Sequence, residues 1–288
     1  MSDIRRVAVL GLGTMGSGIA QVAAAAGYEV TALEADRDRI DAGLAALGTF
    51  LDGGVERGKI TQAERDGTFA RIRPVTDVAE LAGCDLVVEA VTERAEVKRA
   101  LFDAVAGVVG QDALIVTNTS ALSVTDLAAS VARPERFAGL HFFNPAPLMR
   151  VVEVVRALQT APEVIERLAA FVGSLGKDPV VVKDRPGFLV NHLLMPYLND
   201  VVGEYDGDLA DAADIDTAIR LGLGHKLGPL ELLDLIGLDV HLHATQSAYE
   251  ATLDPRFAPP PLLRQMVAAG HHGRKNGQGF RIGREDAR

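Results

Sequence analysis

The sequence contains one cysteine, Cys84, and no tryptophan. A lone cysteine excludes an intrachain disulfide and a cysteine-rich zinc cluster, and it is typical of a reducing compartment. No apolar run approaches the ~20 residues that cross a bilayer. The first residues, Met1–Arg6, lack the small-residue cleavage site of a signal peptide. We therefore expect a cytoplasmic protein that does not bind a membrane.

Positive charge is also scarce. Lysine and arginine number 29 against 39 aspartates and glutamates, so the formal net charge is −10. This balance repels the phosphates of nucleic acids and anionic membranes, and neither is an expected partner. Hydrophobic residues make up 48% of the 288 residues and charged residues 24%, which excludes disorder as an overall description. At ~100–200 residues per domain, the length predicts two domains.

The first fifty residues have the pattern of a dinucleotide-binding unit. An apolar run at 7–10 predicts a buried strand, an alanine-rich segment at 17–26 predicts a helix, and residues 28–33 predict a second strand followed by Glu34. The first strand and the helix are joined by Gly11-Leu12-Gly13-Thr14-Met15-Gly16. Three spaced glycines between a strand and a helix, with an acid about 20 residues further on, form a dinucleotide fingerprint.

Each part of this fingerprint has a physical role. Gly11 permits a tight turn, Gly13 lets the backbone approach a pyrophosphate, and Gly16 lets the helix pack close to the strand. The helix N-terminus supplies N–H groups for the phosphates. Glu34 can accept hydrogen bonds from a ribose diol and repels a 2′-phosphate, which favours NAD over NADP. FAD shares the fingerprint, and only the rest of the chain argues against it.

Strands and helices alternate through the first two thirds of the chain. Helices are predicted at 36–52 and 61–70, joined around Gly53-Gly54, and again at 94–108 and 162–173. Further strands are predicted near 72–75, 86–91, 113–117, 137–141, 151–155 and 180–182, of which 86–91 has the pattern of a buried strand. This alternation predicts an α/β fold, with a Rossmann-like doubly wound, mostly parallel sheet.

The character of the sequence changes at Pro186-Gly187. Strand patterns stop there, and helical periodicity continues at 190–205, 212–221, 229–248 and 261–269. We predict an NAD-binding domain at 1–185 and an all-α substrate and dimerisation domain at 186–288. About 100 residues of helix are few for an independent core, so we expect a homodimer formed through the second domain.

Two residues of the first domain form a candidate acid–base pair. His141 ends a predicted strand, and the C-terminal strand ends of an open parallel sheet face the ligand crevice. Glu153 stands within a run of valines twelve residues further on, where burying a carboxylate is costly without a partner. A histidine would supply that partner, and the carboxylate would orient the imidazole and favour its protonated form.

Ser120 and Asn191 complete the candidate site. Ser120 follows another predicted strand end, and Asn191 begins a helix just beyond the domain boundary. Taken alone they indicate a turn and a helix cap. Beside a nicotinamide they would hold substrate oxygens while His141 accepts the proton of a secondary alcohol and hydride leaves for the ring. Neither a GxSxG nor an HExxH pattern occurs, and we predict no metal site.

These motifs together resemble the L-3-hydroxyacyl-CoA dehydrogenase family, in particular its short 3-hydroxybutyryl-CoA dehydrogenase type. The resemblance covers nearly the whole chain. Besides the glycine-rich turn, it rests on Val87-Val88-Glu89-Ala90, Asn118-Thr119-Ser120, His141-Phe142-Phe143-Asn144-Pro145, Pro186-Gly187-Phe188-Leu189-Val190-Asn191, Gly228-Pro229-Leu230-Glu231-Leu232-Leu233-Asp234 and Gly273-Arg274-Lys275-Asn276-Gly277-Gln278-Gly279-Phe280.

The resemblance implies a reaction, a cofactor and a set of site residues. The reaction is the reversible oxidation of a 3-hydroxyacyl thioester, CoA-linked as the first choice, to the 3-oxoacyl thioester with NAD. His141 is implied as the catalytic base with Glu153 as its partner, and contacts to substrate are implied for Ser120, Asn144, Asn191 and Lys59. Contacts to the cofactor are implied for Gly11, Leu12, Gly13, Thr14, Met15, Gly16, Glu34, Glu93, Lys98, Ser120, Asn144 and Lys275.

Three positions depart from the family pattern. His192 stands where arginine is usual, His225-Lys226-Leu227 where tyrosine or histidine, proline and methionine are usual, and Arg281 where an aromatic residue is usual. These departures leave the acyl pocket open to 3-hydroxyadipyl-CoA, to an acyl-carrier-protein thioester of secondary metabolism, or to a non-thioester alcohol. An NAD(H)-sensing binding protein is the non-enzymatic alternative.

Overall fold

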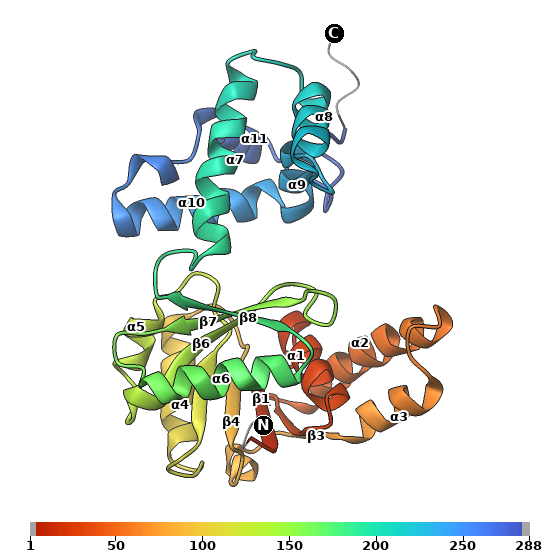
Figure 1. The fold of residues 1–288 in the computed structure, drawn as a ribbon, viewed down its shortest axis with the longest axis vertical. Helices are drawn as coiled ribbons and strands as arrows, with labels where there is room; N and C mark the ends of the chain where they lie inside the picture. Colours follow the sequence, from red (N-terminus) through yellow and green to blue (C-terminus); the bar gives the residue numbers. More distant parts are fainter. Residues whose placement is uncertain (1–3, 284–288) are drawn as a thin grey trace. The chain divides into compact units, whose positions relative to one another are not determined.

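The computed structural model describes residues 4–283. Two compact units divide the chain between Asp184 and Arg185. They are an α/β unit and a helical unit, and Figure 1 traces the elements of each. Over residues 4–283, no helix is long and apolar enough to cross a membrane.

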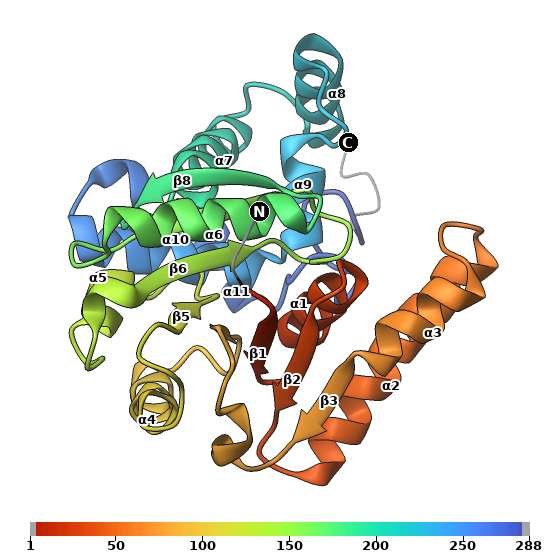
Figure 2. The same cartoon turned by 60° about the horizontal axis from the view of Figure 1, so that its bottom comes forward.

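The α/β unit is built on one sheet of eight strands, in the spatial order β3-β2-β1-β4-β5-β6-β7-β8. Strands β1 to β6 run parallel, β7 turns back against β6, and β8 runs parallel to β7. Figure 2 shows β1, β2 and β3 side by side. The predicted doubly wound, mostly parallel sheet is thereby confirmed. The strands are β1 Arg6–Leu10, β2 Glu29–Leu33, β3 Ile72–Val75, β4 Leu86–Glu89, β5 Leu114–Thr117, β6 Phe137–Phe142, β7 Val151–Arg156 and β8 Asp178–Lys183.

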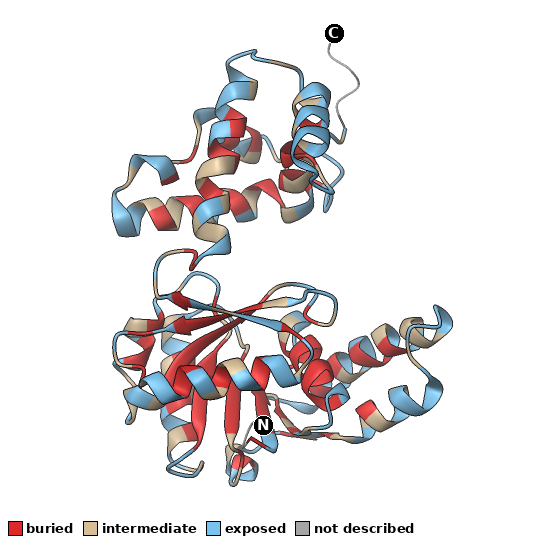
Figure 3. Ribbon diagram, viewed as in Figure 1, coloured by how far each residue is buried: buried red, intermediate tan, exposed pale blue. Residues whose placement is uncertain are grey.

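Helices cover both faces of the sheet. On one face, alternate strand residues form an apolar cluster with three helices, α1 (Thr14–Ala25), α2 (Arg37–Glu56) and α6 (Pro162–Ser174). α3 (Gln62–Ala70) packs on α1 and α2. α4 (Ala95–Ala106) covers the other face, where Phe102 meets Phe137 edge-on, and α5 (Val124–Ala128) contacts β6 there. Figure 3 shows the result, with β4, β5 and β6 buried along their length and α6 buried on one side only.

The helical unit is built around a core of leucine, valine, methionine and phenylalanine side chains. Across residues 185–283, strand pairing is limited to a single bridge between Gly273 and Gln278. The predicted helical character of this part is therefore confirmed. Its helices are α7 Val190–Asp206, α8 Ala212–Leu223, α9 Pro229–Ile236, α10 Leu238–Thr252 and α11 Pro261–Ala268.

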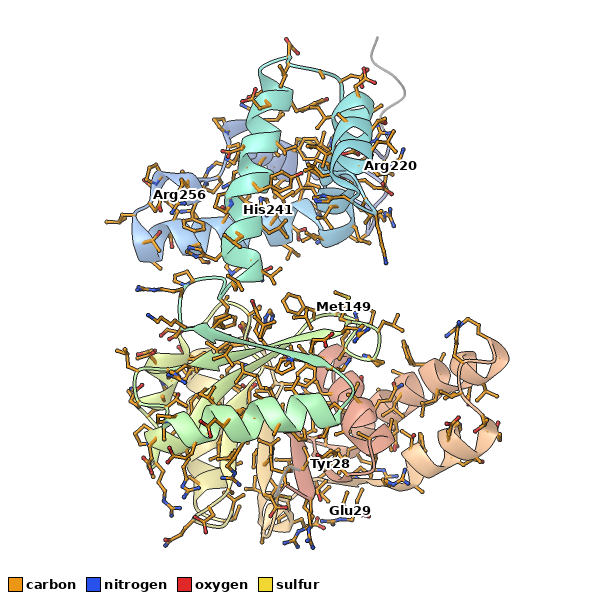
Figure 4. All side chains as sticks on the ribbon, viewed as in Figure 1. Tyr28, Glu29, Met149, Arg220, His241 and Arg256 are labelled. Carbon is orange, nitrogen blue, oxygen red and sulfur yellow. The ribbon has the colours of Figure 1, made fainter. Side chains whose placement is uncertain are left out.

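A buried polar cluster links α7 to α10 within the helical unit. The side-chain amide of Asn199 donates to Thr245 Oγ1 at 2.8 Å. His241, labelled in Figure 4, places Nε2 3.1 Å from the side-chain oxygen of Asn199. Because that oxygen accepts, Nε2 carries the proton. Burial lowers the pKa of His241 to about 4, so the ring is neutral at pH 7.

Two of the predicted helix boundaries are wrong, and glycine conformation explains both. α2 does not end at residue 52 but runs through Gly53-Gly54 to Glu56, and the left-handed Gly58 (φ 62°) follows it. The predicted helix at 229–248 is divided by Gly237 (φ 100°) into α9 and α10. A glycine inside a helix costs about 1 kcal/mol and is tolerated, whereas one at positive φ ends the helix.

Candidate active site

The C-terminal ends of the parallel strands meet at one edge of the sheet. β1 leads into Gly11, β2 into Glu34, β4 ends at Glu89, β5 ends at Thr117 and β6 contains His141. In open α/β sheets, ligands bind at this edge where the strand order reverses. The reversal lies at β1, which pairs with β2 on one side and β4 on the other. The residues able to do chemistry in the α/β unit therefore share one edge.

Glycines shape the turn between β1 and α1. Gly11 adopts φ 90°, a conformation that favours glycine, and a Cβ on Gly16 would lie 1.8 Å from the Gly11 carbonyl oxygen. A Cβ on Gly13 would meet nothing within 4 Å, so the turn is open there. Gly13 is also the N-cap of α1, and no side chain caps that end, so its first N–H groups can bind an anion. This cradle fits the pyrophosphate of a dinucleotide.

Two grooves adjoin the glycine turn. Groove A, of about 480 Å³, lies among α1, α2 and residues 144–147. Groove B, of about 560 Å³, lies among the ends of β1, β2 and β4 and one side of α4. Both grooves are lined by Gly13, Glu34 and Arg39. Glu34 Oε2 accepts a hydrogen bond from the Ala35 N–H at 2.9 Å. The carboxylate lines both grooves, and its contact with a ribose diol stays a prediction.

His141 and Glu153 form a buried pair across the β6–β7 hairpin. The antiparallel register sets the two residues opposite each other, and His141 Nδ1 lies 2.7 Å from Glu153 Oε2. The Glu153 side chain is fully buried and His141 nearly so. Because a carboxylate accepts, Nδ1 carries the proton in the neutral ring and Nε2 carries the lone pair. The contact expected from the sequence is present in the structure.

The loop that follows β5, residues 118–121, is called the Ser120 loop, and Ser120 is exposed on it. Asn118 Oδ1 accepts a hydrogen bond from the Phe142 N–H at 2.9 Å. Phe142 is the residue after His141 in β6. The Ser120 loop is therefore tied to the strand that carries the candidate base.

Glu93 holds the same loop from another direction. Its Oε1 accepts hydrogen bonds from the N–H groups of Ser120 and Ala121 at 3.1 and 3.2 Å, and one from Thr119 Oγ1. Burial acts to raise the pKa of Glu93, but the Lys98 ammonium and these hydrogen bonds outweigh it and lower the pKa overall. Glu93 is therefore a carboxylate at neutral pH.

Glu89 has no role in the sequence-based prediction, yet it lies fully buried at the same edge. Lys98 Nζ donates to Glu89 Oε1 at 2.6 Å, and Thr117 Oγ1 donates to Oε2 at 2.6 Å. Lys98 is itself 1% exposed, although it was predicted to contact the cofactor. The sequence signal that could have indicated this ion pair is an acid at the end of an apolar strand, with a lysine nine residues further on.

Two other predicted residues of the α/β unit are exposed. Asn144 lines groove A, next to the glycine turn. Lys59 lies in the turn between α2 and α3 and occurs among the lining residues of neither groove. The geometry therefore brings Asn144, but not Lys59, to the grooves. The contact between Lys59 and CoA stays a prediction.

The remaining predicted residues belong to the helical unit. Asn191 is the second residue of α7, and Lys275 is exposed and forms an ion pair with Asp239. Their contacts with substrate and cofactor stay predictions. Two departures from the family pattern have partners in this unit. His192 Nδ1 lies 2.9 Å from the Pro186 carbonyl oxygen, and Arg281 forms an ion pair with a buried aspartate of α8; His225 is exposed.

The arrangement suits proton removal beside a dinucleotide. The sheet edge carries an anion cradle, the Glu34 carboxylate at the end of β2, an exposed hydroxyl on the Ser120 loop and a histidine whose outer nitrogen can take a proton. Within residues 4–283, no group of three or more His, Cys, Asp or Glu residues is placed to hold a metal ion. The geometry supports acid–base and hydride chemistry at this edge.

Two family models together match almost the whole chain. One, described as "3-hydroxyacyl-CoA dehydrogenase, NAD binding domain", matches residues 6–185. The other, described as "3-hydroxyacyl-CoA dehydrogenase, C-terminal domain", matches residues 187–282.

Individual relatives agree with the models. The chain is 44% identical over 280 residues to the 3-hydroxyadipyl-CoA dehydrogenase of Escherichia coli, covering 97% of this chain and 59% of that protein. It is 40% identical over 277 residues to the 3-hydroxybutyryl-CoA dehydrogenase of Bradyrhizobium diazoefficiens, covering 96% and 94%. The crystal structure of the (S)-3-hydroxybutyryl-CoA dehydrogenase from Ralstonia eutropha matches with a TM-score of 0.94 and 40% identity, covering 97% and 99%.

Proposed function

The chain belongs to the 3-hydroxyacyl-CoA dehydrogenase family, and on this premise we propose that it reversibly oxidises a short (3S)-3-hydroxyacyl-CoA, such as 3-hydroxybutyryl-CoA, to the 3-oxoacyl-CoA. It is an enzyme, an NAD-dependent dehydrogenase. The observation that carries the proposal is the buried His141–Glu153 pair at the ligand edge of the sheet.

His141 acts as the general base in this proposal. The hydroxyl proton of the substrate passes to Nε2 as the carbon–oxygen double bond forms. Glu153 keeps the ring in the tautomer that has its lone pair on Nε2, and its charge stabilises the imidazolium once the proton has moved. In the reverse direction the imidazolium returns the proton to the forming alkoxide. The Ser120 hydroxyl and Asn191 are proposed to hold the substrate oxygens.

NAD supplies the acceptor for the hydride that leaves the same carbon. The glycine turn and the N-terminus of α1 would hold its pyrophosphate, and Glu34 would bind the adenosine ribose. Glu34 and Gly13 line both grooves, and we assign groove B to the adenosine because apolar side chains such as Val91 and Val97 line it as well. Groove A, which carries Asn144, remains for the substrate side.

A second substrate has specific support. The Escherichia coli relative, at 44% identity, is named for 3-hydroxyadipyl-CoA, so a C6 dicarboxylic thioester belongs in the same assay. Among the departures, Arg281 already has an ion-pair partner in Asp216. It therefore does not present an unpaired cation as an obvious carboxylate receptor. Carrier-protein thioesters and non-thioester alcohols are the remaining alternatives.

We further propose that the active form is a homodimer formed through the helical unit. Leu193 on α7 and Leu221 and Leu223 on α8 are between 63% and 73% exposed, and a second copy of the chain could cover these side chains. Light scattering at micromolar concentration tests this, and a monomer would contradict it. The single thiol, Cys84, is buried and unpaired, which supports a reducing compartment such as the cytoplasm.

The decisive experiment follows NADH oxidation with acetoacetyl-CoA. Wild type is compared with His141→Ala and with His243→Ala, an exposed histidine of α10 as the matched control. We expect turnover in wild type and His243→Ala, and a loss of about 100-fold or more in His141→Ala with NADH binding intact. Turnover that survives in His141→Ala would refute the base assignment. No turnover in wild type would refute the acetoacetyl-CoA assignment.

A further inference from the structure

Three ionisable side chains form a connected row at the ligand edge of the α/β unit. Lys98 Nζ, on α4, donates to Glu89 Oε1 at 2.6 Å. The same nitrogen lies 3.2 Å from Glu93 Oε2. The other oxygen of Glu93 accepts from the N–H groups of Ser120 and Ala121. A chain of contacts thus runs from a buried acid to the loop that carries the candidate substrate residue.

We propose that Glu89 is a positioning residue: through Lys98 it fixes the orientation of Glu93, and through Glu93 it sets the Ser120 loop. The proposal deepens the function proposed above, since it states how the substrate-facing loop is held. It also gives Lys98 a role through Glu93 that requires no contact with the cofactor.

Hydrogen bonds hold both oxygens of the Glu89 carboxylate in place. Its Oε1 accepts from the Val91 N–H at 2.7 Å as well as from Lys98, and its Oε2 accepts from Thr117 Oγ1 at 2.6 Å. Thr117 is its direct neighbour across the β4–β5 ladder. These bonds fix the Glu89 carboxylate between two strand ends, so the ammonium bound to it has one defined place.

The exposures of the two glutamates indicate that Lys98 does more than neutralise Glu89. Glu89 is 0% exposed and needs a counter-ion, which Lys98 supplies. The Glu93 side chain is 40% exposed, so water can solvate it and neutralisation does not require a buried lysine. Lys98 nevertheless reaches Glu93 Oε2 and leaves Oε1 aimed at the loop. The contact therefore orients a carboxylate that is already stable.

Hydrogen exchange of the cofactor-free protein gives a direct test. In Glu89→Gln, Lys98 loses its charged anchor and shifts toward Glu93. We expect the Ser120 and Ala121 amides to exchange at least about tenfold faster. The matched control is Glu80→Gln, which breaks an exposed ion pair with Arg73 in the same unit and should leave these amides unchanged. Equal protection of the Ser120 loop in both variants would overturn the proposal.

A double variant separates positioning from simple stability. Lys98→Met alone leaves Glu89 buried without its counter-ion, and we expect a fall in melting temperature of roughly 5–15 °C. Glu89→Gln/Lys98→Met removes both charges and should recover most of that loss. The fast exchange at Ser120 should remain, because Glu93 still lacks its anchor. Recovery of slow exchange together with melting temperature would show a structural role only and would overturn the proposal.

Turnover is a separate measurement. If wild type reduces acetoacetyl-CoA, Glu89→Gln should lower kcat about 10- to 100-fold through misplacement of the loop, with Glu80→Gln unchanged. A kcat equal to wild type in Glu89→Gln would overturn the proposal. If wild type shows no turnover, the proposed substrate fails while the exchange experiment still decides the role of Glu89.

Discussion

Replacing Glu153 with glutamine preserves the size of the side chain and removes its charge. In wild type the carboxylate accepts a hydrogen bond from the N–H of His141 Nδ1 at 2.7 Å. A glutamine can instead donate from its amide nitrogen to Nδ1, which moves the ring proton to Nε2. The substitution therefore removes the charge that stabilises the imidazolium and also favours the tautomer that has no lone pair toward the substrate.

The size of the effect follows from the contact. A hydrogen bond to a charged group contributes about 1.5–3 kcal/mol, and each 1.36 kcal/mol changes a rate tenfold, so losing it costs about 10- to 150-fold. The pair is fully buried on the Glu153 side, which favours the upper part of this range because solvent does not screen it. The tautomer change adds to the loss, so we expect kcat to fall at least about 100-fold.

The assay is reduction of acetoacetyl-CoA by NADH at pH 7, together with NADH titration by fluorescence. NADH affinity should stay within about twofold of wild type, because Glu153 contributes to neither groove. Glu163→Gln, an exposed acid in the first turn of α6, is the matched control. The reasoning is refuted if Glu153→Gln keeps more than a third of the wild-type kcat while Glu163→Gln is unaffected.

Three other substitutions probe single features. Glu34→Ala should lower the ratio of kcat/KM for NADH to that for NADPH at least about tenfold. The reason is that Arg39 lines both grooves beside Glu34 and would meet the 2′-phosphate. An unchanged ratio would contradict this. Gly16→Ala should lower the melting temperature by at least about 5 °C and weaken NADH binding, because the new Cβ would lie 1.8 Å from the Gly11 carbonyl oxygen; a normal melting temperature would refute it. His241 stays neutral in the folded state while the unfolded chain takes up a proton below pH 6.5, so wild type should lose about 2 kcal/mol relative to His241→Gln between pH 7 and pH 5 in urea unfolding; parallel pH profiles would contradict the low pKa.

Much of the α/β unit could be predicted because its signals are local. A fully buried parallel strand appears as a short apolar run, and β1, β4 and β5 all do. Glu153 stood out because a carboxylate among valines needs a partner, and His141 lay at the strand end that could supply one. The antiparallel register of β6 and β7 then joins residues twelve positions apart.

Helix ends and the partners of two lysines could not be predicted, because they depend on backbone conformation and on contacts between distant segments. The sequence alone does not distinguish Gly53 from Gly58 and Gly237. The backbone φ angle does, because it is positive at the two glycines that end a helix. Lys98 falls in a charged helix and so resembles a surface residue, although the fold turns it onto Glu89. The position of Lys275 beside Asp239 likewise depends on how the last residues fold back onto α10.

The β6–β7 hairpin also determines where this chain can change its length. The connecting loop, residues 143–150, lies outside the ladder that pairs the two strands. An insertion there would leave His141 opposite Glu153, whereas one extra residue inside either strand would turn one of the two to the other face of the sheet. The loop carries Asn144 and lines groove A. Loop insertions can therefore reshape groove A while the contact between His141 and Glu153 is kept.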